Sequence, residues 1–396
     1  MTVEPAVRSP SRLARRVAAV PPSGIRKFFD VIATMPDVIS LGVGEPDFTT
    51  PPQIIEAGVR SLRAGRTHYT SNYGTLELRR ALAKHLARLY EVEYDPEGEL
   101  LITVGASEAV AVAMAALVDP GDEVVLHEPS YVAYTPSVVF NGGGAVHVAT
   151  HADRGFALDP AAVEAAITSR TKVLFLGYPC NPTGAVLDEA TLLALADIAE
   201  RHDLLVVSDE IYDRLVYGDH RHRAFSSLPG ARDRTVLIGG FSKAYAMTGW
   251  RVGWLAAPRD LLEGIVKVHQ YEIMSAPTTA QDAAVVALTG AEPDVQRMVA
   301  EYDRRRQRLV AGFNALGLPT FEPRGAFYAF PDVTSSGLSS AEFSERLLFE
   351  QQVAVIPGDA FGPSGAGHVR ACYATSYEQL ETALERIDRF LGSLRG

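Results

Sequence analysis

From about residue 100 onward, short apolar runs alternate with stretches that have helical spacing. The runs expected to be strands are 100–104, 123–126, 172–176, 204–207 and 235–238, and the helices expected among them are 107–118 and 189–201. Continuous Val, Ile and Leu runs without polar alternation are typical of parallel strands that are buried on both faces. The pattern therefore predicts an α/β fold, with a mostly parallel sheet covered by helices on both faces.

The last hundred residues have a different pattern. A long charged helix is expected at 295–316, strands at 327–330 and 353–356, and a closing amphipathic helix at 377–391. This mixture predicts a smaller α+β domain. A chain of 396 residues also exceeds the roughly 250–300 residues at which single cores stop growing. The expected division is an N-terminal arm that contributes to the small domain at 1–48, a large domain at 49–290 and a small C-terminal domain at 291–396.

Charge and cysteine content exclude several classes of protein. The chain has 48 acidic and 37 basic residues, a formal charge of −11, which argues against nucleic-acid binding because phosphate recognition needs a basic face. Cys180 and Cys372 are too few for a disulfide framework or a Cys-rich zinc site, so we expect no metal and a reducing, cytoplasmic setting. No apolar stretch approaches the roughly 20 residues of a membrane span, and the apolar run at 17–20 is too short for a signal peptide.

Ionisable side chains follow two of the expected strands, and ligands bind beyond the carboxyl ends of parallel strands. Lys243 follows 235–238, and a partly desolvated lysine has a lowered pKa that makes it a nucleophile toward an aldehyde. Asp209 follows 204–207, and a carboxylate there can keep a pyridine nitrogen protonated, so that the ring withdraws electrons. Taken alone, Lys243 is more simply a surface lysine, and Asp209 is equally well the cap of a helix.

Two other segments suggest an oxygen site and a phosphate site. Asn181 begins an Asn-Pro-Thr-Gly segment, and its amide could share a phenolic oxygen with Tyr212, although these residue types also form ordinary turns. The small residues at 105–108 precede a helix, where free amides bind phosphate, with Arg251 adding positive charge. A plain Ser N-cap is the simpler interpretation of that segment.

In this order and spacing, the motifs resemble the fold-type I pyridoxal-phosphate enzymes, in particular the class I aminotransferases. The resemblance covers nearly the whole chain beyond residue 20. It rests on Leu-Gly-Val-Gly-Glu-Pro-Asp-Phe at 41–48, Tyr69 with Gly74, Asn-Pro-Thr-Gly at 181–184, Asp209 with Tyr212, Ser242-Lys243 with Gly249-Trp250-Arg251, and Arg370. The character of the whole chain is most similar to aminotransferases for aromatic amino acids or of broad specificity.

The resemblance implies a role for each of these residues. Lys243 would bind pyridoxal 5′-phosphate as a Schiff base and shuttle the substrate proton. Asp209 would pair with the ring nitrogen, and Asn181 and Tyr212 would bond to the ring oxygen. Tyr131 would stack on the ring. The phosphate would be held by Ala106, Ser107 and Arg251, and by Tyr69 from the other subunit of a homodimer.

The resemblance also implies how the amino acid is held. Arg370 would clamp its α-carboxylate with two parallel hydrogen bonds, assisted by Asn181 and Gly44, and a segment around Ile25 would close over it. One position departs from the pattern of many relatives, because Gly240 stands where they have a hydroxyl residue that contacts the phosphate. The phosphate site is therefore expected to lose one donor.

The expected reaction moves an amino group from an L-amino acid to a 2-oxo acid, with 2-oxoglutarate as the usual acceptor and ping-pong kinetics. Aspartate or alanine aminotransferases and carbon–sulfur β-lyases on the same scaffold are the closest alternatives. A regulator that keeps this fold would need an N-terminal DNA-binding module, for which the stretch before Ile25 is too short. A nicotinamide dehydrogenase is disfavoured because Gly42-Val43-Gly44 has no third glycine in the expected place.

Overall fold

The structure is a computed structural model that describes residues 12–22, 35 and 37–394. Its centre is a seven-stranded sheet with the order β2-β8-β7-β6-β5-β3-β4. The strands are β2 (Leu100–Thr103), β3 (Glu123–Glu128), β4 (Gly144–Ala149), β5 (Thr171–Leu176), β6 (Leu205–Asp209), β7 (Thr235–Gly240) and β8 (Gly253–Ala256).

Only β8 runs against the other strands of this sheet. It pairs antiparallel with both β2 and β7, whereas the β7–β6, β6–β5, β5–β3 and β3–β4 pairs are parallel. Two reversals restore the direction, so β2 points the same way as β7. The carboxyl ends of six strands therefore meet at one edge of the sheet, where ligands bind in such folds.

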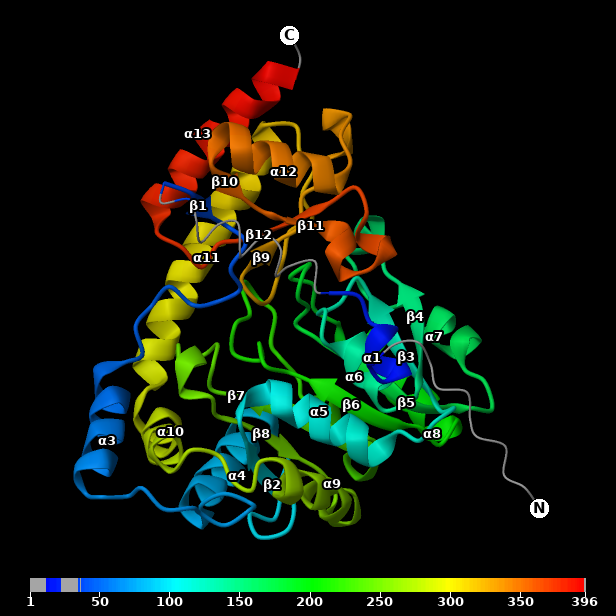
Figure 1. The fold of residues 1–396 in the computed structure, drawn as a ribbon, viewed down its shortest axis with the longest axis vertical. Helices are drawn as coiled ribbons and strands as arrows, with labels where there is room; N and C mark the ends of the chain where they lie inside the picture. Colours follow the sequence, from blue (N-terminus) through cyan, green and yellow to red (C-terminus); the bar gives the residue numbers. More distant parts are fainter. Residues whose placement is uncertain (1–11, 23–34, 36, 395–396) are drawn as a thin grey trace.

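Helices cover both faces of the sheet (Figure 1). They are α1 (Arg15–Ala18), α3 (Pro52–Arg63), α4 (Leu76–Tyr90), α5 (Gly105–Leu117), α6 (Tyr134–Phe140), α7 (Pro160–Ala166), α8 (Glu189–Arg201), α9 (Arg259–Glu272) and α10 (Thr278–Gly290). Successive strand residues point to opposite faces, so Leu101 packs in the core under α5, α6 and α9 while Leu100 packs under α4 and α10. Burial on both sides explains why these strands are continuously apolar.

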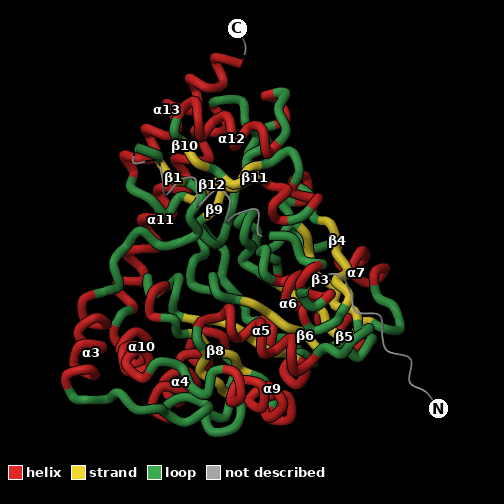
Figure 2. Tube along the Cα trace, viewed as in Figure 1, coloured by secondary structure: helices red, strands yellow, loops and turns green. Residues whose placement is uncertain are grey.

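A smaller layer lies over the carboxyl edge of the sheet, at the top of Figure 1 and Figure 2. Its elements are β1 (Ile39–Ser40), α11 (Glu292–Ala315), β9 (Tyr328–Ala329), α12 (Ser340–Gln351), β10 (Val353–Ala354), β11 (Ile356–Pro357), β12 (Val369–Cys372) and α13 (Tyr377–Leu394). β1 pairs parallel with β10, and β12 lies between β11 and β9 in a separate antiparallel sheet. This arrangement brings the segment after β1 and the strand β12 to the edge of the large sheet.

The expected fold class is confirmed, with a mostly parallel sheet between helices. Two strands of the sheet were not expected. β4 is an edge strand that is only partly buried and whose apolar residues are interrupted by His147, and β8 is a short strand that begins with a glycine. The run at 353–356 is divided between β10 and β11. The boundary near residue 290 stays a prediction, since α11 begins there and runs into the smaller layer.

Candidate active site

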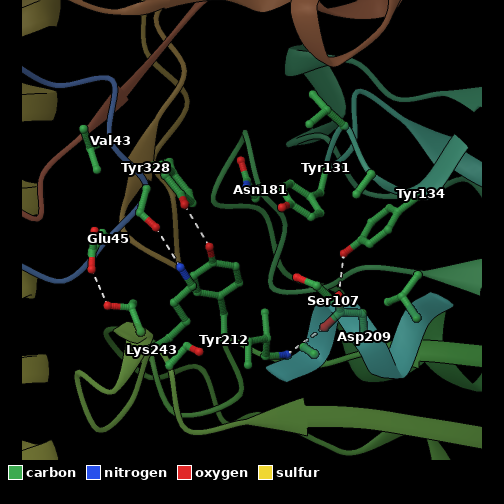
Figure 3. A pocket seen from close by; sticks show the side chains of 18 of the residues that line it. Val43, Glu45, Ser107, Tyr131, Tyr134, Asn181, Asp209, Tyr212, Lys243 and Tyr328 are labelled. Carbon is green, nitrogen blue, oxygen red and sulfur yellow. Dashed lines mark hydrogen bonds between the residues drawn. The ribbon is translucent and has the colours of Figure 1, made fainter. Parts of the chain in front are cut away.

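A cavity of about 480 Å³ lies between the carboxyl edge of the large sheet and the smaller layer (Figure 3). Most of the residues that the sequence analysis singled out line it together. These are Gly44, Ala106, Ser107, Tyr131, Asn181, Asp209, Tyr212, Lys243, Arg251 and Arg370. They come from the segments that follow β1, β3, β5, β6 and β7, from the first turn of α5 after β2, from the last position of β6 and from β12. Residues spread over more than 300 positions therefore meet in one place.

Lys243 points into this cavity. Its Nζ donates a hydrogen bond of 2.7 Å to the carbonyl oxygen of Gly44, and it lies 5.7 Å from the ring centre of Tyr212. Burial lowers the pKa of Lys243 to about 8, because a charged ammonium is poorly solvated there. The surface-lysine interpretation is therefore wrong. A larger fraction of this amine is therefore in the neutral, nucleophilic form near neutral pH than for a lysine on the surface.

Asp209 lines the same cavity as a buried carboxylate at the last position of β6. Its Oδ2 accepts a 3.0 Å hydrogen bond from the Tyr134 hydroxyl, and its Oδ1 accepts one of 3.1 Å from the Ile211 amide. Burial raises the pKa of Asp209 to about 6, and the bond from Tyr134 opposes that rise. No described helix begins between β6 and Phe225, so Asp209 is not a helix cap. A cationic ring placed beside it would favour the ionised form.

The N-terminus of α5 lies beside the guanidinium of Arg251. The helix begins at Gly105 without a side-chain cap, so Ser107 lies inside the first turn and the N-cap interpretation is wrong. The Arg251 guanidinium lies over this turn, because a Cβ added to Gly105 would come within 2.7 Å of Nη2. Free amides of the first turn and an adjacent cation together favour a phosphate group.

The first turn of α5 is supported from behind by a buried acid. The Glu108 carboxylate accepts a hydrogen bond from the Val104 amide, and its other oxygen lies 2.5 Å from Nδ1 of His269 on α9. His269 is fully buried. These contacts hold in place the turn whose residues Ala106 and Ser107 line the cavity.

Arg370 forms the opposite wall and is 2% exposed. Its Nη1 donates a 2.8 Å hydrogen bond to Oδ1 of Asn181, and its Nη2 donates one of 2.6 Å to the carbonyl of Gly42. Its Nε has no hydrogen-bond partner among the described residues. A buried guanidinium with an unpaired donor is costly, so this position favours an anionic ligand.

Two hydroxyls meet on the remaining wall. The Tyr212 and Tyr328 oxygens are 2.8 Å apart, and both side chains are buried (Figure 3). Asn181 lies in the same cavity as part of the turn at 181–184, where Gly184 has φ of +71°. The turn interpretation of this segment and its position at the site are therefore compatible.

Two of the singled-out residues, Tyr69 and Gly240, do not line this cavity. The Tyr69 side chain is 80% exposed and lies outside the cavity of its own chain. Ile25 lies outside the described residues. Gly240 closes β7, where an added Cβ would lie 2.9 Å from Cδ1 of Ile211. A hydroxyl residue at Gly240 would thus have to displace Ile211, and the expected loss of a phosphate donor stays a prediction.

The sequence analysis missed Tyr134, Tyr328 and Glu108 as parts of the site. Tyr134 lies three positions after Tyr131, so the start of a helix there would have brought both rings to one side. Glu108 lies in a segment that had already been singled out. Tyr328 had no local signal, because its contacts are with Tyr212 and Arg370, which are far away in the sequence.

The comparisons with known proteins agree with this geometry. The family model described as aminotransferase class I and II matches residues 36–387. A putative aminotransferase, YugH, of Bacillus subtilis (strain 168) is 49% identical over 96% of this chain and 98% of its own length. An aspartate aminotransferase of Pyrococcus abyssi is 45% identical over 96% of this chain and 98% of its own length. The crystal structure of an aromatic aminotransferase from Pyrococcus horikoshii OT3 has a TM-score of 0.89 at 44% identity, covering 93% of this chain and 99% of its own.

Proposed function

We propose that this chain, which belongs to the aminotransferase class I and II family, takes amino groups from aromatic or a broad range of L-amino acids. Members of this family are aminotransferases that depend on pyridoxal 5′-phosphate, and this chain is one of them. The proposed acceptor is 2-oxoglutarate. The observation that supports the proposal best is one cavity that contains the amine of Lys243, the carboxylate of Asp209 and the guanidinium of Arg370.

The chemistry of the cavity fits the cofactor. It has an amine of lowered pKa, a buried carboxylate and a helix N-terminus with an adjacent arginine. These would receive the aldehyde, the ring nitrogen and the phosphate. Bound pyridoxal phosphate supplies an electron-withdrawing ring that stabilises negative charge at the substrate α-carbon.

We propose that Asp209 keeps a positive charge on the ring nitrogen, and that Tyr134 orients this carboxylate by its 3.0 Å hydrogen bond. Asn181 and Tyr212 would donate to the ring oxygen, and Tyr131 would pack against the ring. Ala106, Ser107 and Arg251 would hold the phosphate. Lys243, once free of the aldehyde, would take the proton from the substrate α-carbon and return it to the product, as a general base with a pKa close to the working pH.

The first prediction concerns the pH dependence of cofactor binding. Burial lowers the pKa of Lys243 to about 8. The fraction of the amine that is neutral and reactive therefore reaches about one half near pH 8 and is nearly complete one pH unit higher. The rate at which cofactor-free protein regains visible absorbance with pyridoxal phosphate should rise with a midpoint near pH 8. Stopped-flow absorbance at several pH values measures this midpoint. A rate that still increases steeply at pH 10 would contradict the lowered pKa.

The second prediction concerns Arg370. Replacing it with alanine removes two charge-assisted hydrogen bonds to the substrate α-carboxylate, each worth roughly 1.5–3 kcal/mol. We expect KM to rise roughly 100-fold for phenylalanine and aspartate alike, because both have an α-carboxylate. Arg370→Lys keeps the charge without the planar fork and should have an intermediate effect. If KM rises for aspartate only, Arg370 instead recognises an acidic side chain.

The substrate preference is proposed from the charges around the cavity. Among the described residues that line it, the lysines and arginines are Lys243, Arg251 and Arg370, and each has a proposed role. The described part of one chain therefore leaves no cation for a side-chain carboxylate. Val43, Val110, Ile211 and Tyr131 line the same cavity, and apolar walls of this kind favour aromatic side chains.

A screen of half-reactions tests the proposed function. The protein is mixed with single L-amino acids without an acceptor, and the change in visible absorbance gives the rate of amino-group transfer. Phenylalanine and tyrosine are expected to react faster than aspartate. A clear preference for aspartate would overturn the proposed specificity and favour the activity for which the relative from Pyrococcus abyssi is named. Pyruvate formed from cystathionine without an acceptor would instead indicate β-lyase activity.

A homodimer with shared sites is also proposed. Tyr69 is 80% exposed and Tyr271 is 87% exposed, and Ile273 and Met274 are also largely exposed. The two segments are linked, since the Thr278 hydroxyl donates a 2.7 Å hydrogen bond to the carbonyl of His68. Exposed apolar side chains in linked segments are typical of an interface, and Tyr69 would then reach the phosphate of the partner subunit. A mass in solution of twice 42.7 kDa would support this assembly.

Among the described residues, no helix is both long and apolar enough to cross a membrane. We propose a cytoplasmic setting on a separate ground, because Cys180 and Cys372 are both free and buried thiols, as expected under reducing conditions.

A further inference from the structure

Tyr328 is the buried residue that contacts both halves of the proposed site. It lies on β9, opposite Cys372 in the pair with β12, and is 1% exposed. Its ring centre is 4.5 Å from the guanidinium carbon of Arg370, and its hydroxyl is 2.8 Å from that of Tyr212 (Figure 3). One side chain therefore connects the proposed carboxylate clamp with the proposed donor to the ring oxygen.

The direction of the hydroxyl–hydroxyl bond follows from proton counting. A tyrosine hydroxyl has one hydrogen to donate and lone pairs to accept. An anionic ring oxygen accepts hydrogen bonds only, so Tyr212 must use its single hydrogen for that oxygen. The bond between the two tyrosines then has to be donated by Tyr328. In the reverse direction, Tyr212 would have no hydrogen left for the cofactor.

The surroundings of the Tyr328 hydroxyl are closely packed. A Cβ added to Gly44 would lie 2.4 Å from Oη of Tyr328, so the absence of a side chain at Gly44 makes room for this hydroxyl. The carbonyl of Gly44 is the acceptor of the Lys243 amine. The hydroxyl therefore has a defined position beside Tyr212, and a small change at Gly44 would displace it.

We propose that Tyr328 is a positioning residue for transamination, which donates its hydrogen to Tyr212, directs the hydrogen of Tyr212 to the ring oxygen and supports the face of Arg370. This inference rests on the proposed role of Tyr212 in binding that oxygen. Hydrogen bonds in a chain strengthen one another, so Tyr212 is a better donor with Tyr328 behind it.

Spectroscopic titration of the cofactor-loaded protein tests this inference without measuring activity. A hydrogen bond to the ring oxygen lowers the pH at which the visible absorbance changes. Tyr212→Phe should raise this midpoint by about one unit or more, and Tyr328→Phe by about half a unit to one unit. The double variant should titrate like Tyr212→Phe alone, since Tyr328 acts through Tyr212.

Two further variants make the test specific. Tyr373→Phe is the matched control, because Tyr373 is a fully buried tyrosine whose hydroxyl donates to the Ala326 carbonyl at 3.3 Å and does not line the cavity. It should leave the midpoint unchanged. Gly44→Ala leaves the tyrosine at position 328 but displaces its hydroxyl. It should raise the midpoint as Tyr328→Phe does. It therefore tests the same contact if Tyr328→Phe does not fold.

The outcomes distinguish the proposed role of Tyr328 from the proposed role of Tyr212. If Tyr212→Phe shifts the midpoint but Tyr328→Phe and Gly44→Ala do not, the role of Tyr328 is wrong and that of Tyr212 stands. If Tyr212→Phe causes no shift, the proposed role of Tyr212 is itself wrong. If the shifts of the two single phenylalanine variants add up in the double variant, Tyr328 does not act through Tyr212.

Discussion

Lys243→Ala is expected to abolish both the yellow colour of the purified protein and its transaminase activity. The variant loses the amine that binds the cofactor and the base that moves the α-proton. Because general base catalysis alone contributes roughly 10²–10⁴-fold, we expect kcat to fall by roughly 10⁴-fold or more. Absorbance spectra and single-turnover rates with phenylalanine measure the two effects.

A matched control separates this loss from a general effect of removing a lysine. Lys84→Ala changes an exposed lysine on α4 that does not line the cavity, and should keep both colour and activity. A Lys243→Ala protein that retains substantial activity, or a wild type that is active but colourless, would contradict the mechanism.

Asp209→Asn should reduce kcat by roughly 10²–10³-fold, the effect of removing one preorganised charge from an active site. Asparagine has nearly the same shape and can still accept the hydrogen bond from Tyr134, but it cannot keep the ring nitrogen positively charged. The negative charge that develops at the substrate α-carbon would then be less stabilised. Single-turnover kinetics and the absorbance spectrum report this change while the cofactor remains bound.

Asp213→Asn is the comparison for this variant. Asp213 is a partly buried carboxylate whose pKa is likewise raised by desolvation, but it accepts a 2.5 Å hydrogen bond from Tyr90 and lies outside the cavity lining. It should affect the thermal unfolding midpoint more than kcat. An Asp209→Asn enzyme within threefold of the wild-type kcat would show that no charge at this position is needed.

The position of Tyr134 explains how the carboxyl group of Asp209 can be ionised although it is buried. Burial alone would favour the neutral acid, which could not stabilise a cationic ring nitrogen. The hydrogen bond from Tyr134 opposes this tendency. The tyrosine hydroxyl remains protonated at neutral pH, because burial raises its own pKa further, so it is a constant donor to the carboxylate.

Local patterns were sufficient to predict the alternation of strands and helices, the α/β class and the polar residues that follow the buried strands, whereas Gly44, Tyr131 and Arg370 were named only through the family resemblance. The reason is that a buried parallel strand needs a continuous apolar run, and the residues after it necessarily lie at the same edge of the sheet. Lys243, Asp209 and Asn181 could be found in this way. β4 and β8 could not, because the apolar residues of the edge strand β4 are interrupted by His147, and β8 is a short strand that begins with a glycine and has no β-branched residue.

The tertiary structure decided what depends on contacts between distant segments. The local sequence favoured a surface lysine at Lys243, whereas tertiary contacts enclose its amine, with the carbonyl of Gly44 at 2.7 Å and the ring centres of Tyr212 and Phe327 at 5.7 and 5.5 Å. Tyr328 became part of the site because β9 pairs with the strand that contains Arg370. Burial, pKa and hydrogen-bond direction depend on which side chains meet in space. The sequence by itself therefore determined the elements and the chemical groups at their ends, and the packing of the smaller layer against the sheet determined how those groups interact.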